Sequence, residues 1–232
     1  MRVLSLNAWG AYGPPERRPV LRQALLDLDA DLLLLQEANV PELLPALPHP
    51  FRFHFPETGL TISSRHAAGQ ERRHTYKTVS PLESHPRGVL FTKISGLGFD
   101  LWAGTTHLAW KTDDHATRRA QVEELLELIS GLEGAVLIGG DFNTVEEDFA
   151  IRRMVSAGFT DLQAGTGCIT WDNRNPFIQS HSVRFPDRRI DYLFLKDPRS
   201  TVRDCRIACD RPNAAGLFPS DHYGVLADLI QR

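Results

Sequence analysis

The chain has 232 residues, of which 42% are hydrophobic and 24% charged, and a formal net charge of -3. This composition is typical of a globular protein long enough to bury a large core. The net charge provides no overall basic field to attract nucleic acid. Cys168, Cys205 and Cys209 lack paired spacing, which argues against a disulfide framework and a structural zinc site and fits a reducing compartment.

Strand-like and helix-like segments alternate from the N-terminus. Residues 3–6 predict a first strand, and the apolar residues within 14–30 recur at helical spacing. Residues 31–38 form a continuous apolar run, which suits a strand covered on both faces. Residues 41–87 are rich in Pro, His and Arg, and predict only short strands and irregular loops. The first apolar run is too short for a signal peptide or a membrane span, so we expect a cytoplasmic protein.

The remainder of the chain continues the alternation. The predicted elements are strands at 88–94 and 99–109 joined as a hairpin by 95–98, an amphipathic helix at 115–132, a buried strand within 134–144, a shorter helix at 146–159, and strands at 189–196, 201–208 and 223–230. No repeat or flexible linker interrupts them, so we expect a single domain over residues 1–232. Hairpins mixed with helical crossovers indicate an α/β protein with at least one mixed sheet. Residues 160–188 are weakly patterned, as functional loops often are.

Polar residues fall where the predicted strands begin or end. They are Asn7, Gln36, Glu37, His107, Asp141, Asn143, Asp191, Asp221 and His222. Ligands of open α/β sheets collect at strand ends, so one shared site is predicted. Taken singly, each residue also has a structural interpretation: a turn or helix-cap residue for Asn7, Glu37 or Asp141, and a hydrogen-bonded core histidine for His107.

Asp191 is the hardest of these residues to explain structurally. It lies within the apolar run 190–194, where an unpaired carboxylate would be costly. It needs a donor or cationic partner, and His222 is the candidate. A histidine held by a buried carboxylate can accept a proton from an attacking water. Carboxylate and amide oxygens such as those of Glu37, Asp221 and Asn7 suit a hard cation such as Mg²⁺.

Six motifs together resemble a known superfamily. The motifs LSLNAWG, LLLQEA, THLAW, GGDFNT, RIDYLFL and PSDHYGV resemble, in order and spacing, those of the endonuclease/exonuclease/phosphatase superfamily, which has the deoxyribonuclease-I-like fold. The resemblance extends from residue 3 to about residue 228. It implies a four-layer α-β-β-α sandwich, in which two packed mixed sheets are flanked by helices. It also implies Mg²⁺- or Mn²⁺-dependent attack of water on a phosphate ester.

The resemblance also implies residue roles. Glu37 would be the principal metal ligand, with Asn7 and Asp221 beside it. His222 would be the general base, oriented by Asp191.

Three further residues complete the implied site. Asp141 would position the water or assist the leaving group, although the family's Asp141 and His222 roles are assigned in more than one way. Asn143 and His107 would hold the phosphate and stabilise the transition state.

The substrate is the least determined feature. The segment 169–176 with 188–194 is most similar to the tyrosyl-DNA phosphodiesterase branch and its bacterial relatives. Trp171 would then line the substrate pocket; the alternative is that it anchors the core. Arg189 would contact the phosphate; the alternative is that it forms a structural salt bridge.

Other classes remain open. We predict a phosphodiesterase whose substrate is a phosphate ester, DNA included, with no membrane anchor and no obligatory protein partner. The alternatives are a sphingomyelinase-like or small-molecule phosphodiesterase or phosphatase, and a non-catalytic phosphate-binding module of the same fold.

Overall fold

The computed structural model describes residues 1–232 except 97, 99, 182–183, 198 and 232. Its strands form two six-stranded mixed sheets. The first sheet contains β1 (Arg2–Asn7), β2 (Leu32–Gln36), β3 (Phe51–Phe55), β4 (Leu60–Ser64), β11 (Ser200–Ala208) and β12 (Gly224–Gln231), in the order β11-β12-β1-β2-β4-β3. The second contains β5 (Ala68–Thr75), β6 (Gly88–Ile94), β7 (Leu101–His107), β8 (Ala135–Asp141), β9 (Thr160–Asp161) and β10 (Asp191–Lys196), in the order β5-β6-β7-β8-β10-β9.

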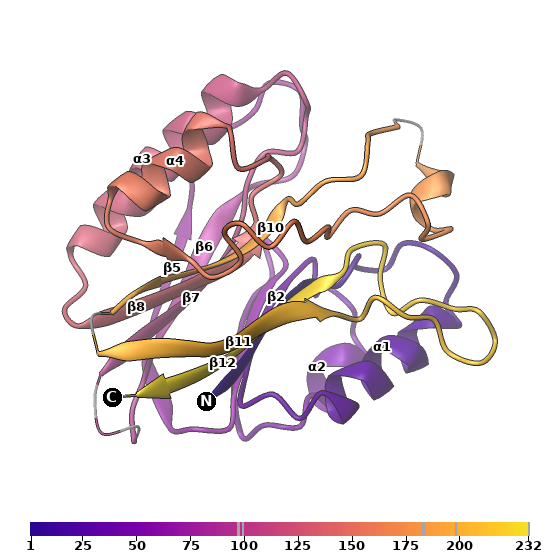
Figure 1. The fold of residues 1–232 in the computed structure, drawn as a ribbon, viewed down its shortest axis with the longest axis horizontal. Helices are drawn as coiled ribbons and strands as arrows, with labels where there is room; N and C mark the ends of the chain where they lie inside the picture. Colours follow the sequence, from indigo (N-terminus) through magenta and orange to yellow (C-terminus); the bar gives the residue numbers. More distant parts are fainter. Residues whose placement is uncertain (97, 99, 182–183, 198, 232) are drawn as a thin grey trace.

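Helices cover the outer faces of the two sheets. They are α1 (Arg17–Asp27), α2 (Leu43–Ala46), α3 (His115–Ser130) and α4 (Phe149–Ser156), with a short 3-10 helix η1 (Ile178–Ser180) in a loop. Figure 1 shows α1 and α2 on one side of the packed sheets and α3 and α4 on the other. The predicted four-layer sandwich is therefore confirmed.

The core consists of three apolar layers that follow from strand alternation. In β2, Leu32 and Leu34 pack between the sheets, whereas Leu33 and Leu35 pack under α1 and α2. Successive side chains of a strand point to opposite faces, so a strand buried on both faces needs an unbroken apolar run. This explains why residues 32–35 are all leucine.

Some sequence predictions differ from the structure in extent. Residues 41–87 contain β3, β4 and β5, which the Pro-, His- and Arg-rich composition obscured. β6 and β7 pair antiparallel as the predicted hairpin requires. Its predicted connection at 95–98 includes residue 97, which lies outside the described residues. No helix in the described part of the chain is long and apolar enough to cross a membrane.

The sheet registers bring the polar strand ends to one end of the sandwich. β1 runs parallel to β2, and β7 parallel to β8. His107 is the cross-strand neighbour of Asp141, and Asp141 is the neighbour of Asp191 on β10. Three predicted site residues thus occupy adjacent positions across β7, β8 and β10.

Candidate active site

Asp141 lies at the centre of the group. Its Oδ2 accepts a hydrogen bond of 3.0 Å from Nδ2 of Asn7, and lies 3.4 Å from Nε2 of His107 and 3.8 Å from Nε2 of His222. Its Oδ1 accepts the backbone N–H of Asn143 at 2.9 Å. Burial raises the pKa of Asp141 to about 7; His222 acts against this increase, while the Asp191 carboxylate adds to it.

Asp191 and His222 form a buried pair. Nδ1 of His222 lies 2.9 Å from Oδ2 and 3.2 Å from Oδ1 of Asp191, whose side chain is fully buried. Burial lowers the pKa of His222, but the carboxylates of Asp191 and Asp141 outweigh it and hold that pKa well above the ordinary value. The partner that the sequence predicted for Asp191 is therefore in place, and these surroundings favour the imidazolium form of His222.

Asn7 joins two carboxylates from different sheets. Its Nδ2 donates to Oε1 of Glu37 at 3.1 Å as well as to Asp141, and its Oδ1 accepts the backbone N–H of Trp9 at 2.9 Å. The Trp9 contact fixes the orientation of the amide, so Asn7 here acts as a donor that spaces the carboxylates. Its second oxygen lone pair remains for the predicted metal contact.

Glu37 is the most open of the acidic side chains. It follows β2 with a backbone φ of 49°, in the left-handed region that residues other than glycine seldom adopt. Its side chain is 29% exposed, compared with 2% for Asp141 and 3% for Asp221. Burial and the nearby Asp221 carboxylate raise the pKa of Glu37. The Glu37 carboxylate therefore reaches solvent more than those of Asp141 and Asp221, from a backbone conformation that is strained.

Asp221 lies before β12, in irregular backbone. Its Oδ2 is 3.0 Å from Nε2 of His181, and its Oδ1 lies 3.2 Å from Oγ of Ser220, which also donates to the carbonyl oxygen of Asn7. The His181 ring lies between those of Trp9 and Trp171, with centroids 5.8 and 5.2 Å away. Asp221 and His222 are therefore neighbours in sequence with separate partners.

His107 has the opposite electrostatic character to His222. Burial and the adjacent Arg87 guanidinium hold the pKa of His107 well below its ordinary value. Nη1 of Arg87 lies 2.8 Å from Nε2 and 2.9 Å from Nδ1 of His107, and Arg87 is paired with Glu83 at 2.7 Å. His107 is therefore neutral. Asn143, with φ of 53°, donates Nδ2 to the carbonyl oxygen of Leu108 at 3.1 Å.

The two predicted substrate-binding residues occupy different environments. The Trp171 ring meets the His222 ring edge-on, with centroids 5.1 Å apart. Arg189 instead pairs with Asp161 at 2.8 Å and with Glu146 at 2.7 Å. Its side chain therefore forms the structural salt bridges that the sequence left as an alternative to phosphate contact.

Two residues of this centre were missed by sequence reasoning. Arg87 ends the segment 41–87, where only short strands and irregular loops were predicted, and only its position just before a buried strand marks it. His181 lies in the irregular stretch 160–188, whose length was the available signal.

The donor set fits a divalent cation. Asp141, Asp191 and His222 each offer a ligand atom within 4.8 Å of the other two, and form a buried group that could hold a metal ion. The predicted ligands Glu37 and Asp221 lie close enough that one carboxylate raises the pKa of the other. Desolvated carboxylates in this number favour a nearby cation, and oxygen donors favour Mg²⁺ or Mn²⁺ over zinc.

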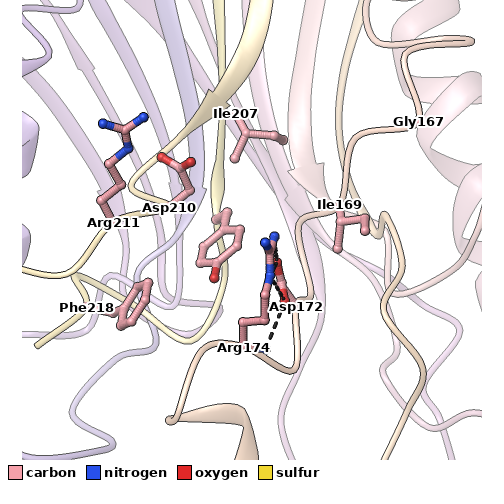
Figure 2. A pocket seen from close by; sticks show the side chains of 9 residues that line it. Gly167, Ile169, Asp172, Arg174, Ile207, Asp210, Arg211 and Phe218 are labelled. Atoms are coloured by element: carbon pink, nitrogen blue, oxygen red, sulfur yellow. Dashed lines mark hydrogen bonds and ion pairs between the residues drawn. The ribbon is translucent and has the colours of Figure 1, made fainter. Parts of the chain in front are cut away.

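A cavity of about 440 Å³ is lined in part by residues that follow members of this centre in the sequence. Asp172 and Tyr223 line it, each next in sequence to a residue of the centre, Trp171 or His222. Figure 2 shows Arg174 paired with Asp172 in this cavity. The residues that line this cavity include no member of the candidate active site.

Comparisons with solved structures agree with this architecture. A Danio rerio TDP2 complexed with a single-strand DNA product is 20% identical and matches with a TM-score of 0.82 over 100% of this chain and 99% of that chain. An endonuclease/exonuclease/phosphatase family protein of Bacteroides thetaiotaomicron is 19% identical, with a TM-score of 0.78 over 100% and 95% of the two chains. A mannosyl-6-phosphatase of the same organism is also 19% identical, with a TM-score of 0.74 over 99% of each chain.

Sequence comparison identifies the family directly. No curated protein matches the chain. At 19–20% identity the structural likenesses establish the fold alone. The model of the Endonuclease/Exonuclease/phosphatase family, however, matches residues 4–222, nearly the whole chain. Members of this family hydrolyse phosphate-ester bonds. The chain belongs to the endonuclease/exonuclease/phosphatase family.

Proposed function

We propose that this protein is a divalent-metal-dependent phosphoesterase that cleaves a phosphodiester by attack of water. One observation carries the proposal: the Asp141 carboxylate is surrounded by Asn7, His107 and His222, side chains that come from both sheets. Turn or cap residues have no reason to converge in this way. Glu37, Asp221 and Asn7 would hold the cation, which would neutralise charge on the phosphate and lower the pKa of a bound water.

The protonation states support a division of roles between Asp141 and His222. The Asp191 and Asp141 carboxylates raise the pKa of His222 and favour its imidazolium form, which would have to lose a proton before it could act as a base. The pKa of Asp141, raised to about 7, is suited to accepting a proton near neutral pH. We therefore assign proton transfer from water to Asp141. His222, held by Asp191, would stabilise negative charge on the phosphoryl oxygens.

Hydrolysis of bis-p-nitrophenyl phosphate tests the proposal. We expect turnover with Mg²⁺ or Mn²⁺, loss of turnover in excess chelator, and a loss of roughly 100-fold or more in Asp141→Asn. Asp228→Asn is the matched control, because Asp228 lies on the same scaffold and pairs with Arg2, at the opposite end of β1 from Asn7. Absence of turnover with both metals and with several phosphate esters would identify a binding module instead.

A substrate panel then distinguishes the phosphoester classes. It should contain single-stranded and duplex DNA, 5′-tyrosyl DNA, sphingomyelin, small phosphodiesters and a sugar phosphate. TDP2 and the mannosyl-6-phosphatase among the structural likenesses justify the DNA and sugar-phosphate members. The preferred substrate is the one with the highest kcat/KM.

A further inference from the structure

Arg188 lies next to Arg189 but in a different environment. Its backbone N–H donates to the carbonyl oxygen of Trp171 at 3.0 Å, and the Trp171 N–H donates to the Arg188 carbonyl at 2.9 Å. Residues that exchange both hydrogen bonds in this way are direct cross-strand partners, and their side chains project from the same face. Trp171 projects toward His222, so Arg188 lies on the face of the catalytic centre.

The guanidinium of Arg188 stacks on an aromatic ring. It lies over the ring of Phe185, with Cζ 3.8 Å from the centroid. Its Nε is buried and, among the described residues, has no hydrogen-bond partner. Arg189, by contrast, forms ion pairs with both Asp161 and Glu146. A buried donor without a partner is costly, so the site is complete only when an acceptor arrives.

The acceptor is expected to be anionic and to lie beside Asp141. Burial lowers the pKa of Arg188, whereas the Asp141 carboxylate raises it. The two side chains are therefore close enough to interact electrostatically. A tetrahedral phosphate between them would accept bidentate hydrogen bonds from the guanidinium.

We propose that Arg188, rather than Arg189, is the substrate-binding cation of this protein, and that it holds a non-bridging phosphate oxygen of the ester attacked at Asp141. This inference rests on the proposed function for the identity of the ester. It also makes a binding prediction that does not require turnover, because the Arg188 guanidinium should take inorganic phosphate.

The test compares Arg188→Gln, Arg188→Lys and Arg188→Ala with Arg184→Gln. Arg184 is an exposed arginine of the same loop, and its substitution removes the same charge. We expect Arg188→Gln to weaken inorganic phosphate binding, measured by calorimetry, and to lower kcat/KM for bis-p-nitrophenyl phosphate about 10- to 100-fold. Arg188→Lys should recover part of the binding, and added guanidinium ion should restore turnover to Arg188→Ala but change nothing in Arg184→Gln. Unchanged Mn²⁺ affinity and melting temperature would show that the metal site and fold are intact.

Each other outcome has a distinct meaning. If the wild-type protein hydrolyses esters and Arg188→Gln binds phosphate and substrate equally well, the Arg188 assignment is wrong and the proposed function stands. If Arg184→Gln weakens phosphate binding and lowers kcat/KM as much as Arg188→Gln does, the loss comes from the change in overall charge, and the assignment is again wrong. If the wild type binds phosphate through Arg188 but hydrolyses no ester, the binding assignment stands and the proposed function fails.

Discussion

Substitution of Asp191 by asparagine removes the charge that holds His222 while keeping the shape of the side chain. The carboxylate Oδ2 lies 2.9 Å from Nδ1 of His222. At an effective dielectric constant of about 20, unit charges at this distance attract by about 6 kcal/mol. Burial alone lowers the pKa of His222. Without the Asp191 charge, we expect this pKa to fall, which favours the neutral imidazole.

The consequences of Asp191→Asn can be measured separately. Turnover of bis-p-nitrophenyl phosphate should fall by roughly 100- to 1,000-fold, the range associated with loss of a group that stabilises transition-state charge. Affinity for Mn²⁺, measured by calorimetry, should change little, because the Asp191 carboxylate is paired with Nδ1 of His222 and is not among the proposed metal ligands. An NMR titration of the His222 ring follows the pKa directly. The reasoning is refuted if metal affinity falls in proportion to turnover, or if the pKa of His222 does not fall; Asp228→Asn is again the control.

Three further perturbations address the metal, the fold and pH. Glu37→Gln should raise the Mn²⁺ concentration needed for half-maximal binding more than it lowers kcat at saturating metal; equal effects would contradict its role as a ligand. Gly140→Ala should lower the free energy of unfolding, measured with denaturant, by about 3 kcal/mol or more, because its Cβ would lie 2.3 Å from the carbonyl oxygen of Thr106. Gly69→Ala is the control: its Cβ meets no atom within 4 Å, so it should cost about 0.5 kcal/mol or less. Burial raises the pKa of Asp148, but hydrogen bonds from the backbone of α4 and from a histidine outweigh it and lower that pKa. Asp148→Ala should therefore cost about 1 kcal/mol at pH 7, and this deficit should shrink as the pH falls below the unfolded pKa of about 3.9; a deficit that stays constant down to pH 2 would contradict the assignment.

The sequence predicted the fold wherever apolar periodicity was strong. The strand predicted at 31–38 and the helix predicted at 115–132 match β2 and α3, because burial on both faces and burial on one face leave different patterns of apolar residues. β5 could not be identified, because it is an edge strand with largely exposed polar side chains and no alternation to read. Backbone pairing with β6 holds this segment as a strand, although its own sequence does not indicate one.

The sequence predicted those residues of the candidate site that are polar side chains at or near the ends of strands. Asp191 was marked by its apolar surroundings, and its contact with His222 followed from the need for a partner. Arg188 and Arg189 are identical in type and adjacent in sequence, so nothing local separates them. The antiparallel bridge to Trp171 decides which one faces the catalytic centre. Pairing between distant segments carries that information.

The two buried histidines of the centre show why roles depend on neighbours rather than on residue type. His107 and His222 are 3% and 5% exposed in their side chains, so desolvation disfavours the charged form of both. Arg87 adds to this effect at His107, whereas Asp191 and Asp141 reverse it at His222. The surroundings of His107 therefore favour the neutral ring, which can donate or accept, and those of His222 favour the cation, which can only donate. Asp141 lies between them, 3.4 Å from one Nε2 and 3.8 Å from the other, so a phosphate at this point would meet a neutral ring on one side and a charged ring on the other. If an ester binds here as we propose, this asymmetry would favour one orientation of its phosphate.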